Sequence, residues 1–294
     1  MKDDLRRWTE YHEAYGHDYL LVNDAIWTVY QRMIVPDGPA CRDFTVSSCQ
    51  QRTLLSHFKK AALLRYTDGC QAECDNPPWY AVTCDRFLDL ADCSANTRSK
   101  IRRGLKKCEV AMVDAEYIAR HGYDVFMAAY AKYTGVALPT VSNAEWAQRA
   151  LISKNFPDLR HYWAALIDGR LVAYSANTIY GTTEASYSEV KLHPDFLKAY
   201  PSYALFFKMN EYYLRDQAFQ YVNDGFRSIK HETNIQDFLM EKFGFRRMPT
   251  NLYVRYRPWV KAALMLPGFA KRWLGSRVSR YAALCALDDA RVHS

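Results

Sequence analysis

The sequence lacks any long apolar run, and no segment approaches the roughly 20 consecutive apolar residues of a membrane-spanning helix. No internal repeat or low-complexity segment is present either. Hydrophobic residues make up 49% and charged residues 24% of the 294 residues, which is typical of a globular protein. These features exclude a disordered or collagen-like chain and indicate one large domain or two small ones.

Acidic residues are absent from two stretches of the chain. Residues 242–287 contain ten Lys or Arg and no Asp or Glu, and residues 93–108 contain six more basic residues and again no acid. The formal net charge of +7 therefore arises from these two segments, because the remaining residues sum to −9. Any interaction with a polyanion has to depend on them.

No CxxC pair occurs among the eight cysteines, and the closest two, Cys70 and Cys74, are separated by three residues. Because zinc sites usually need paired cysteines at a fixed spacing, we expect no metal site. Residues 1–13 carry charge throughout, which is not typical of a secretory signal peptide. We therefore expect buried, reduced thiols and a cytoplasmic protein.

The amino-terminal third shows short elements separated by turn signals. We expect a helix over 4–15, strands over 19–22 and 26–31, a Pro/Gly connector over 33–39, a helix over 53–64 that passes into a strand over 61–66, and a strand over 79–84.

The remainder of the chain shows clearer signals for helices and strands. A basic helix is predicted over 94–107, capped by Asn96 or Thr97, and is followed by a strand over 108–113 and helices over 115–133 and 143–153. Strands over 162–167, 171–180 and 184–192, a helix over 203–214, a strand over 219–223, a helix over 234–243 and a strand over 252–256 come next, before a helical tail. This order predicts an α/β protein of the α+β type, with a mixed sheet as its core.

Three stretches resemble the GNAT acyltransferase superfamily, and most closely its FemAB-like branch, in which a GNAT domain follows a second, often degenerate copy. Residues 96–103 (NTRSKIRR) are similar to the basic helix that opens the second domain of these proteins. Residues 193–205 are similar to their strand end, loop and cofactor-facing helix, and residues 234–245 to the final GNAT helix. The resemblance implies a degenerate lobe over 1–95, an acyltransferase domain over 96–256 and a basic amphipathic tail over 257–294.

The resemblance further implies an N-acyltransferase, such as an N-acetyltransferase, that uses acetyl-CoA or another acyl-CoA and an amine acceptor. The GNAT pyrophosphate loop is normally rich in glycine, whereas residues 197–204 contain none. The unsatisfied N–H groups at a helix start can hold a pyrophosphate without glycine. The tyrosine that many GNAT enzymes carry in the last helix falls on Met240. The expected cofactor-binding residues are Val190, Leu192, Lys198, Ser202, Tyr203, Ala204 and Asn234.

Three residues are candidates for the chemistry of acyl transfer, which needs a base for the amine and an acid for the leaving thiolate. Glu189 on the strand 184–192 is the favoured base if partial burial raises its pKa, and a solvated strand carboxylate is the alternative. His193 could relay protons or could be a structural histidine before a proline turn. Tyr203 could donate to the thiolate or could be a core aromatic residue.

The densest polar segment of the chain is residues 223–234, between a strand end and a helix start, where α/β proteins place ligands. We expect the acceptor to bind here. The candidate substrate-binding residues are Asp224, Arg227, Lys230, His231 and Glu232. Thr233 or Asn234 also fits the cap of the following helix.

Two alternatives to this function remain open at this point. The first is a FemAB-type transferase that depends on aminoacyl-tRNA; because such relatives usually carry a long helical arm, for which we see no room, we do not expect nucleic acid as a partner. The second is a degenerate module that binds a membrane or a protein. The basic helix 94–107 is in turn either a solvated face or a phosphate-binding face.

The basic tail combines apolar and cationic residues, with Trp259 and Trp273 among the apolar ones. It predicts either peripheral contact of residues 257–285 with the inner face of a membrane, or packing on the amino-terminal lobe or in a homodimer. The acceptor classes are an amine-bearing small molecule, an amino-sugar and a lipid precursor.

Overall fold

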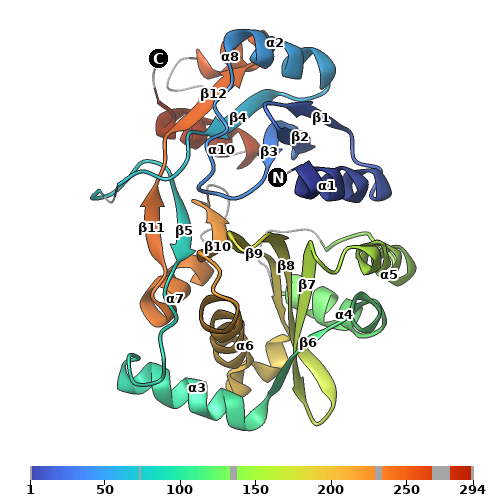
Figure 1. Ribbon diagram of the computed structural model, residues 1–294, viewed down its shortest axis with the longest axis vertical. Helices are drawn as coiled ribbons and strands as arrows, with labels where there is room; N and C mark the ends of the chain where they lie inside the picture. Colours follow the sequence, from blue (N-terminus) through green and yellow to red (C-terminus); the bar gives the residue numbers. More distant parts are fainter. Residues whose placement is uncertain (1, 73, 133–137, 229–233, 267–278, 293–294) are drawn as a thin grey trace. The chain divides into compact units, whose positions relative to one another are not determined.

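Two compact units make up the protein in the computed structural model (Figure 1). The structure describes residues 2–72, 74–132, 138–228, 234–266 and 279–292. The amino-terminal unit comprises Met1–Val82, Phe226–Ile235 and Arg247–Ser294, and the central unit comprises Thr83–Gly225 and Gln236–Arg246. Each unit therefore joins segments that are distant in sequence, whereas the expected division after residues 95 and 256 treats every domain as continuous.

The amino-terminal unit is built on a five-stranded sheet with the order β1-β2-β3-β4-β12. Its strands are β1 (Tyr19–Val22), β2 (Ala25–Tyr30), β3 (Met33–Asp37), β4 (Leu63–Thr67) and β12 (Leu252–Tyr256), and its helices are α1 (Lys2–Ala14), α2 (Ser48–His57), α8 (Pro258–Leu264) and α10 (Ser279–Ala290). Leu64 belongs to a core that includes Leu54 of α2, and its neighbour Leu63 belongs to a second core with Leu287 of α10. Consecutive strand residues point to opposite faces, so the sheet is buried on both sides.

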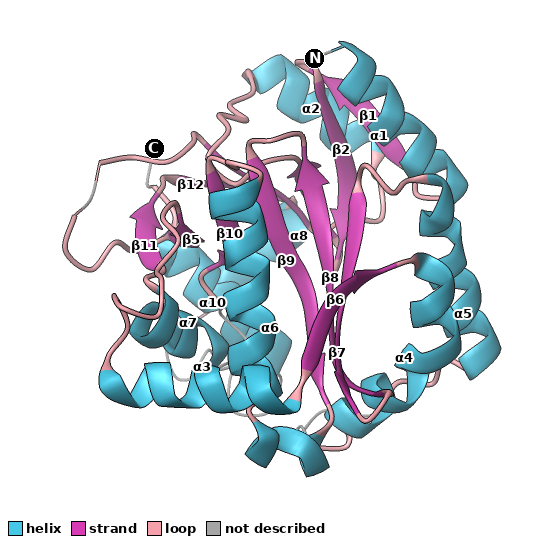
Figure 2. Ribbon diagram, turned by 60° about the horizontal axis from the view of Figure 1, so that its bottom comes forward, coloured by secondary structure: helices cyan, strands magenta, loops and turns pink. Residues whose placement is uncertain are grey.

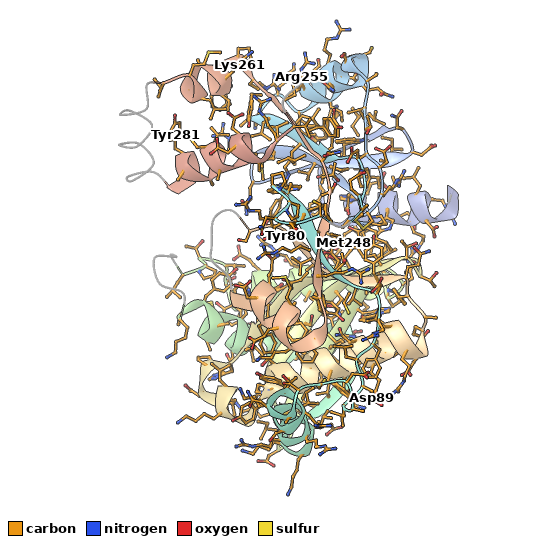
Figure 3. The ribbon with its side chains drawn as sticks, turned by 90° about the vertical axis from the view of Figure 1, so that its left-hand side faces the viewer. Tyr80, Asp89, Met248, Arg255, Lys261 and Tyr281 are labelled. Carbon is orange, nitrogen blue, oxygen red and sulfur yellow. A yellow bond between two sulfur atoms is a disulfide. The ribbon has the colours of Figure 1, made fainter. Side chains whose placement is uncertain are left out.

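The described part of the tail packs on the amino-terminal unit. Tyr281 of α10 donates to the carbonyl of Ala263 in α8 at 2.7 Å, and Figure 3 shows these two helices side by side. Arg257 donates to the carbonyls of Phe58 and Ala61 at 3.0 Å each. No helix among the described residues is both long and apolar enough to cross a membrane.

A seven-stranded sheet with the order β11-β5-β10-β9-β8-β7-β6 lies mainly in the central unit, although most residues of β5 and of β11 belong to the amino-terminal unit. The strands of this sheet are β5 (Tyr80–Cys84), β6 (Glu109–Val113), β7 (Arg160–Ile167), β8 (Arg170–Tyr180), β9 (Glu184–Leu192), β10 (Tyr221–Phe226) and β11 (Arg246–Pro249), and the helices of the central unit are α3 (Ala95–Lys107), α4 (Ala115–Tyr130), α5 (Asn143–Ile152), α6 (Pro201–Asn210) and α7 (Asn234–Phe243). The chain passes between the units within β5, β10 and β11 and near the start of α7.

Helices cover both faces of this sheet. α4 and α5 bury one face, where Ile118 and Phe126 pack with Tyr174 and Ala176 of β8. α6 covers the other face and lies along β9 and β10 in Figure 2, and its Met209 Sδ accepts a hydrogen bond from the Asn177 amide at 3.4 Å. The predicted mixed sheet flanked by helices is confirmed.

Several element bounds agree with the sequence prediction, because strong turn signals flank them. β9, α7 and β12 have the predicted bounds. Gly244, which ends α7, has φ +72°, and a Cβ there would lie 2.8 Å from Leu88 Cδ1. The left-handed backbone therefore favours glycine at this position, and any other residue would also displace the end of the Leu88 side chain.

Other local predictions are wrong for identifiable reasons. Residues 33–39 do not form a connector over their whole length, because β3 occupies Met33–Asp37 and its Pro36 lies beyond the last pair with β4, where proline is tolerated. α2 starts five residues earlier than predicted, because Ser47 and Gln50 form a capping box. Ser94 caps α3 instead of Asn96 or Thr97.

Sheet membership was also predicted incorrectly. The strand 252–256 was expected in the core sheet of the acyltransferase domain, but it pairs antiparallel with β4 of the amino-terminal unit. β11 was not predicted, and β10 starts at Tyr221 and not at residue 219. α6 starts at Pro201 and is continued by a π-helical turn over Glu211–Asp216.

The expectation of reduced, buried thiols is wrong for four of the eight cysteines. Cys41 and Cys70 form a disulfide across 29 residues of sequence, and Cys49 and Cys74 are exposed free thiols. The pairing depends on the contact between two loops, which the cysteine spacing does not reveal. Buried free thiols are found at Cys84, Cys93 and Cys108.

Candidate functional site in the central unit

The parallel strands β9 and β10 pair over only three residues each, from Glu184 with Tyr221 to Ser186 with Asn223. Beyond these pairs β9 continues to Leu192. In this second half, β9 pairs only with β8 among the described residues. Backbone N–H and C=O groups on such an edge need another partner. This edge of β9 is therefore a candidate ligand-binding edge.

A β-bulge lies on β9 where its pairing with β10 ends. Between its pairs with Ala176 and Thr178 of β8, β9 holds one residue more than β8 does. An extra residue reverses the alternation of side chains. Tyr187 accordingly lies on the α6 face, where its Oη donates to Asn210 Oδ1 at 2.6 Å, and Glu189 lies on the opposite face.

Glu189 is held by two side chains on the face that α4 covers. Tyr174 Oη donates to Glu189 Oε1 at 2.9 Å, and Lys191 Nζ lies 3.9 Å from the same oxygen. Burial lowers the pKa of Lys191, whose ammonium lies 4.5 Å from the ring centroid of Tyr130. Burial, and then the charge of Glu189, raises the pKa of Tyr174, which keeps its phenol protonated as a donor. The predicted base is therefore anchored, with 31% of its side chain exposed.

Asp224 directly follows the last residue of β10 that pairs with β9. Burial raises the pKa of its carboxyl to about 7. Its neighbour Asn223 is fixed, because its amide donates to the buried Glu184 at 2.9 Å and its Oδ1 accepts from the Gly225 N–H at 2.8 Å. Asp224 thus stands within β10 where the strands diverge, and burial brings the pKa of its carboxyl close to neutral pH.

α6 begins without a side-chain cap. The preceding residue, Tyr200, has the left-handed conformation with φ 62° and ψ 40°, and Pro201 occupies the first helical position. The N–H groups of Tyr203 and Ala204 reach the Tyr200 carbonyl at 3.1 and 3.3 Å. The Ser202 N–H has no partner among the described residues, so the start of α6 can still donate to an anion.

The basic helix α3 packs closely against this helix start. A Cβ on Gly104 would lie 2.7 Å from the Tyr200 carbonyl oxygen and 3.3 Å from Ala204 Cβ, so the approach requires glycine. Cys108, which follows α3, lies with its Sγ 4.0 Å from the carbonyl oxygen of Ala199. The close contact places the basic side chains of α3 beside the first turn of α6.

Two of these side chains reach the aromatic residues of the helix start. The Arg103 guanidinium lies 4.7 Å from the ring centroid of Tyr200, and Lys100 Nζ lies 5.5 Å from that of Tyr203. Neither cation forms an ion pair with an acidic group in the described part of the chain. An uncapped helix start beside two such cations favours an anion. The sequence analysis left a phosphate-binding face open for this basic helix but named none of its residues in the site, and Gly104 was the available signal.

The other two predicted catalytic residues have structural contacts. His193 Nδ1 accepts from the Asp195 N–H at 3.4 Å and so caps the 3-10 turn Pro194–Ala199. The ring of Tyr203 packs edge-on against Phe238 at 5.0 Å, and the residue is 8% exposed. These contacts agree with the structural alternatives for both residues.

The remaining predicted residues are spread over several elements. Val190 and Leu192 lie on β9 and are half-buried, Lys198 is exposed on the 3-10 turn, and Asn234 is the first residue of α7. Arg227 belongs to the amino-terminal unit, where its guanidinium donates to the Pro78 carbonyl at 2.7 Å. The remaining three, Lys230, His231 and Glu232, lie outside the described residues.

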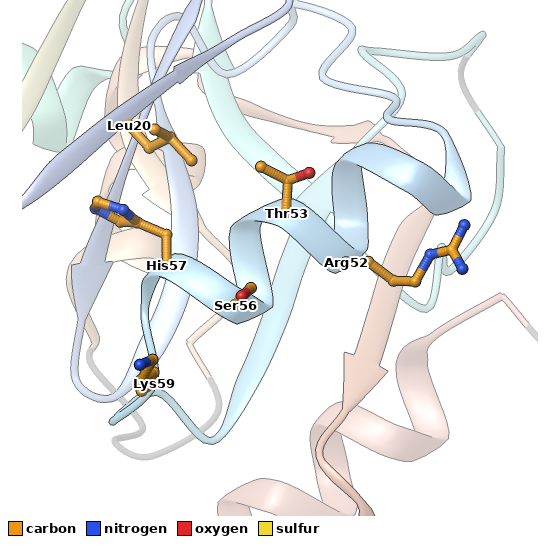
Figure 4. A pocket seen from close by; sticks show the side chains of 6 residues that line it. All are labelled: Leu20, Arg52, Thr53, Ser56, His57 and Lys59. Atoms are coloured by element: carbon orange, nitrogen blue, oxygen red, sulfur yellow. The ribbon is translucent and has the colours of Figure 1, made fainter.

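An open pocket of about 730 Å³ lies in the amino-terminal unit and coincides with none of the predicted site residues. Four of its side chains, Arg52, Thr53, Ser56 and His57, come from α2, and Leu20 comes from β1 (Figure 4). His57 Nε2 lies 3.0 Å from Asp18 Oδ1. Within the described residues, no three His, Cys, Asp or Glu side chains gather as metal ligands do.

Comparison with known proteins identifies the fold. No family model and no curated protein matches this chain. Among solved structures, it is similar to the C-terminal domain of a protein described as a lysylphosphatidylglycerol synthetase from Agrobacterium fabrum, with 12% identity, a TM-score of 0.56, and coverage of 90% of this chain and 95% of that one.

It is also similar to FemX, with 11% identity, a TM-score of 0.54, and coverage of 88% of this chain and 93% of that one. A conserved protein of unknown function from Bacteroides thetaiotaomicron matches with 12% identity, a TM-score of 0.50, and coverage of 85% and 90%. The chain therefore has the GNAT-like fold that the resemblance predicted. At these identities the likeness concerns the fold alone.

Proposed function

We propose that the protein is an acyltransferase that moves an acyl group from an acyl-CoA to an amine. The observation that carries the proposal is the start of α6, which combines an uncapped N–H group with Lys100 and Arg103 of α3. A phosphate-bearing carrier fits this arrangement, since helix starts and unpaired cations both favour anions. Among the solved structures of the same fold, the name lysylphosphatidylglycerol synthetase denotes the making of an acylated product.

The residues present fit such a donor. The Ser202 N–H is free to donate, and the left-handed Tyr200 takes the place that a glycine would have in a Gly-rich loop. The unpaired edge of β9 at Val190 and Leu192 can hydrogen-bond an amide-bearing arm as a neighbouring strand would. Lys198 and Asn234 remain proposed contacts. When bound, the donor supplies an activated acyl group whose thiolate leaves.

The amine must lose a proton as its nitrogen bonds to the acyl carbon and the carbon–sulfur bond breaks. We assign this proton to Asp224, because its pKa near 7 lets the carboxylate accept a proton and release it again at neutral pH. Tyr203, in the first turn of α6, is the proposed donor to the leaving thiolate. Glu189 remains the rival acceptor, on the opposite face of the sheet from Tyr187.

Calorimetric titration with acetyl-CoA and a long-chain acyl-CoA tests the donor site. Lys100→Ala combined with Arg103→Ala should weaken binding by about 10²- to 10⁴-fold, since hydrogen bonds to charged groups contribute about 1.5–3 kcal/mol each. The matched control is Lys106→Ala with Lys107→Ala, which removes two exposed cations from the same helix. Equal affinities for the two double variants, or no binding of either thioester to the wild-type chain, would contradict the proposal.

A second donor class is favoured by one specific observation. α3 exposes Arg102, Lys106 and Lys107 in addition to the two cations beside α6, and this exceeds what one pyrophosphate needs. Aminoacyl-tRNA would use the wider basic face, and its affinity would fall steeply with salt. The control variant of the calorimetric experiment separates the two donors: loss of the Lys106 and Lys107 charges weakens binding of aminoacyl-tRNA and leaves acyl-CoA binding unchanged.

The acceptor is proposed to be an amine-bearing small molecule, an amino-sugar or a lipid precursor. Trp259 and Met265 of the α8 region are 56% and 71% exposed and lie near Lys261, which supports contact of the tail with an anionic membrane surface at the cytoplasmic face. Sedimentation with phosphatidylglycerol vesicles tests this point. Binding that survives Trp259→Ala with Met265→Ala would contradict it.

We further propose that residues 1–95 contain a degenerate copy of the fold, that residues 96–256 carry the transferase activity and that residues 257–294 form a basic amphipathic helical tail. The order β3, α2, β4 in the amino-terminal unit repeats the order β9, α6, β10 in the central unit. In both cases the two strands are parallel and pair over a few residues before they part.

A further inference from the structure

An arginine in the amino-terminal unit occupies an unusual position in the sheet. Arg65 lies on β4 directly after Leu64, the last residue of β4 that pairs with β3. Its partner across β12 is Val254. It shares a face of the strand with Leu63, whose surroundings are an apolar core. A cation therefore stands where the pattern of the strand predicts an apolar residue.

The surroundings of Arg65 supply stacking but no counter-charge. Its guanidinium lies 5.6 Å from the ring centroid of Trp79, and Trp79 stacks on Phe226 at 6.1 Å with an interplanar angle of 18°. No acidic group of the described residues lies within ion-pair distance of it. Burial lowers the pKa of the guanidinium to about 10, so the group remains charged at neutral pH. Arg65 is half-buried, and a cation partly withdrawn from water without a counter-charge is costly to the fold.

Arg65 is one of the residues that line a small cavity of about 50 Å³. The cavity lies between β3, the loop that follows it and β4, and its walls include Val35, Phe44 and Trp79. A Cβ on Gly38 would lie 2.7 Å from Phe44 Cζ, so glycine permits the close packing of this wall. The volume exceeds the roughly 10–15 Å³ that one water needs, and it suits one small polyatomic group.

A second polar group in the cavity wall also lacks a partner. The indole N–H of Trp79 is buried and makes no hydrogen bond within the described part of the protein, although Trp79 is only 1% exposed. Buried donors are nearly always paired in native proteins. Arg65 and Trp79 thus line one cavity, and the described residues offer no counter-charge to the first and no acceptor to the N–H of the second.

We propose that this cavity binds an oxyanionic group, the carboxylate or phosphate of a small molecule, with Arg65 as its counter-ion and the Trp79 N–H as a further donor. The planar guanidinium matches two oxygens of a carboxylate or phosphate in a bidentate arrangement. The apolar walls suit a ligand whose remaining part is apolar. This site is independent of the donor site proposed for the central unit.

Thermal unfolding in three salts tests the proposal. Sodium acetate and sodium phosphate are compared with sodium chloride at equal ionic strength and pH, for the wild type, Arg65→Met and the control Arg247→Met. Arg247 is exposed and stacks on Tyr80 at 5.0 Å, so its variant removes an arginine with a similar aromatic contact in the same unit. We expect acetate or phosphate to raise Tm by about 2–4 °C over chloride in the wild type and in Arg247→Met. The Tm of Arg65→Met should be the same in all three salts.

The larger of the two anion effects identifies the group as a carboxylate or a phosphate. Equal Tm values in all three salts for the wild type, or the same rise in Arg65→Met, would overturn the proposal. A second readout does not depend on the folding of Arg65→Met: the indole N–H resonance of Trp79, assigned with Trp79→Phe, should shift on addition of the effective anion to the wild type. A resonance that stays unchanged in both acetate and phosphate would also overturn it.

Discussion

Two strand–helix–strand segments of this chain share one order and differ in how their helices begin. β3 and β4 are connected through α2, and β9 and β10 through α6, and in each pair the strands are parallel for a few residues only. The capping box of α2 pairs the Gln50 N–H with the Ser47 side chain and the Ser47 N–H with the Gln50 side chain, whereas α6 has no side-chain cap. A side-chain cap competes with a ligand for the first donors of a helix, and a helix start without such a cap has no competing side chain. The comparison teaches that the order of elements alone does not mark a binding site.

A second difference concerns the residue at which the strands part. Arg65 stands at this point of β4 and Asp224 at this point of β10. Burial moves their pKa values in opposite directions, to about 10 for Arg65 and to about 7 for Asp224. Arg65 therefore stays charged at neutral pH and suits binding, whereas Asp224 gains and loses a proton and suits catalysis.

The largest effect is expected from Asp224→Asn. If Asp224 accepts the amine proton, the variant should lower kcat/KM by about 10²- to 10⁴-fold. The wild-type rate should rise as the pH increases through about 7, because the carboxylate is then deprotonated, and the variant should lose this rise. Glu189→Gln is the matched control. A loss of kcat/KM that occurs only in Glu189→Gln would show that Glu189, on the other face of the sheet, is the base.

Asp224 also predicts the pH dependence of stability. Its pKa in the folded protein is raised from the ordinary value of 3.8 to about 7. The folded state therefore binds the proton more tightly than the unfolded state, and this contribution to stability is lost as the pH rises from about 4 to about 7. Urea unfolding across this range should show that Asp224→Asn gains stability relative to the wild type as the pH increases.

A smaller effect is expected from Gly104→Ala, which tests the contact between α3 and α6. The added Cβ would meet the Tyr200 carbonyl oxygen at 2.7 Å, so overpacking should cost about 1–3 kcal/mol of unfolding free energy. Acyl-CoA affinity should fall with it, because Lys100 and Arg103 are displaced from the start of α6. Ser99→Ala, on the exposed side of the same helix, should change neither quantity.

The smallest effect is expected from removing a serine side chain at the start of α2 or of α6. Ser47→Ala removes the side-chain cap of α2 and should cost about 1 kcal/mol of unfolding free energy. Ser202→Ala removes a side chain that caps nothing and should leave stability unchanged. Neither variant should alter acyl-CoA binding, since Ser202 offers its backbone N–H. Equal stability losses would show that the two helices do not differ in capping.

The sequence predicted those elements whose ends depend on local signals. Pro194 after β9 and Gly244 after α7 mark such ends. The sheet in which β12 pairs was not predictable, because its partner β4 is nearly 200 residues away, as in the pair of Tyr256 with Leu63. Periodicity describes one strand and carries no information on its neighbour in the sheet.

The candidate site was predictable to a similar extent. Ser202 and Asp224 were named from their places in the loop and strand pattern. The role of Lys100 and Arg103 depends on the contact of Gly104 with Tyr200, which joins positions far apart in sequence. The bulge on β9 separates Glu189 from Tyr187, which regular alternation would have placed on one face.

The most direct test of the account is an NMR titration of the ¹⁵N-labelled chain with acetyl-CoA, in which the amides of the two helix starts are followed together. The account predicts saturable shifts of Ser202, Tyr203 and Ala204 at the start of α6, with Cys49 and Gln50 at the start of α2 unchanged. Shifts confined to the start of α2, or none at either helix, would contradict the claim that the uncapped start of α6 binds the donor.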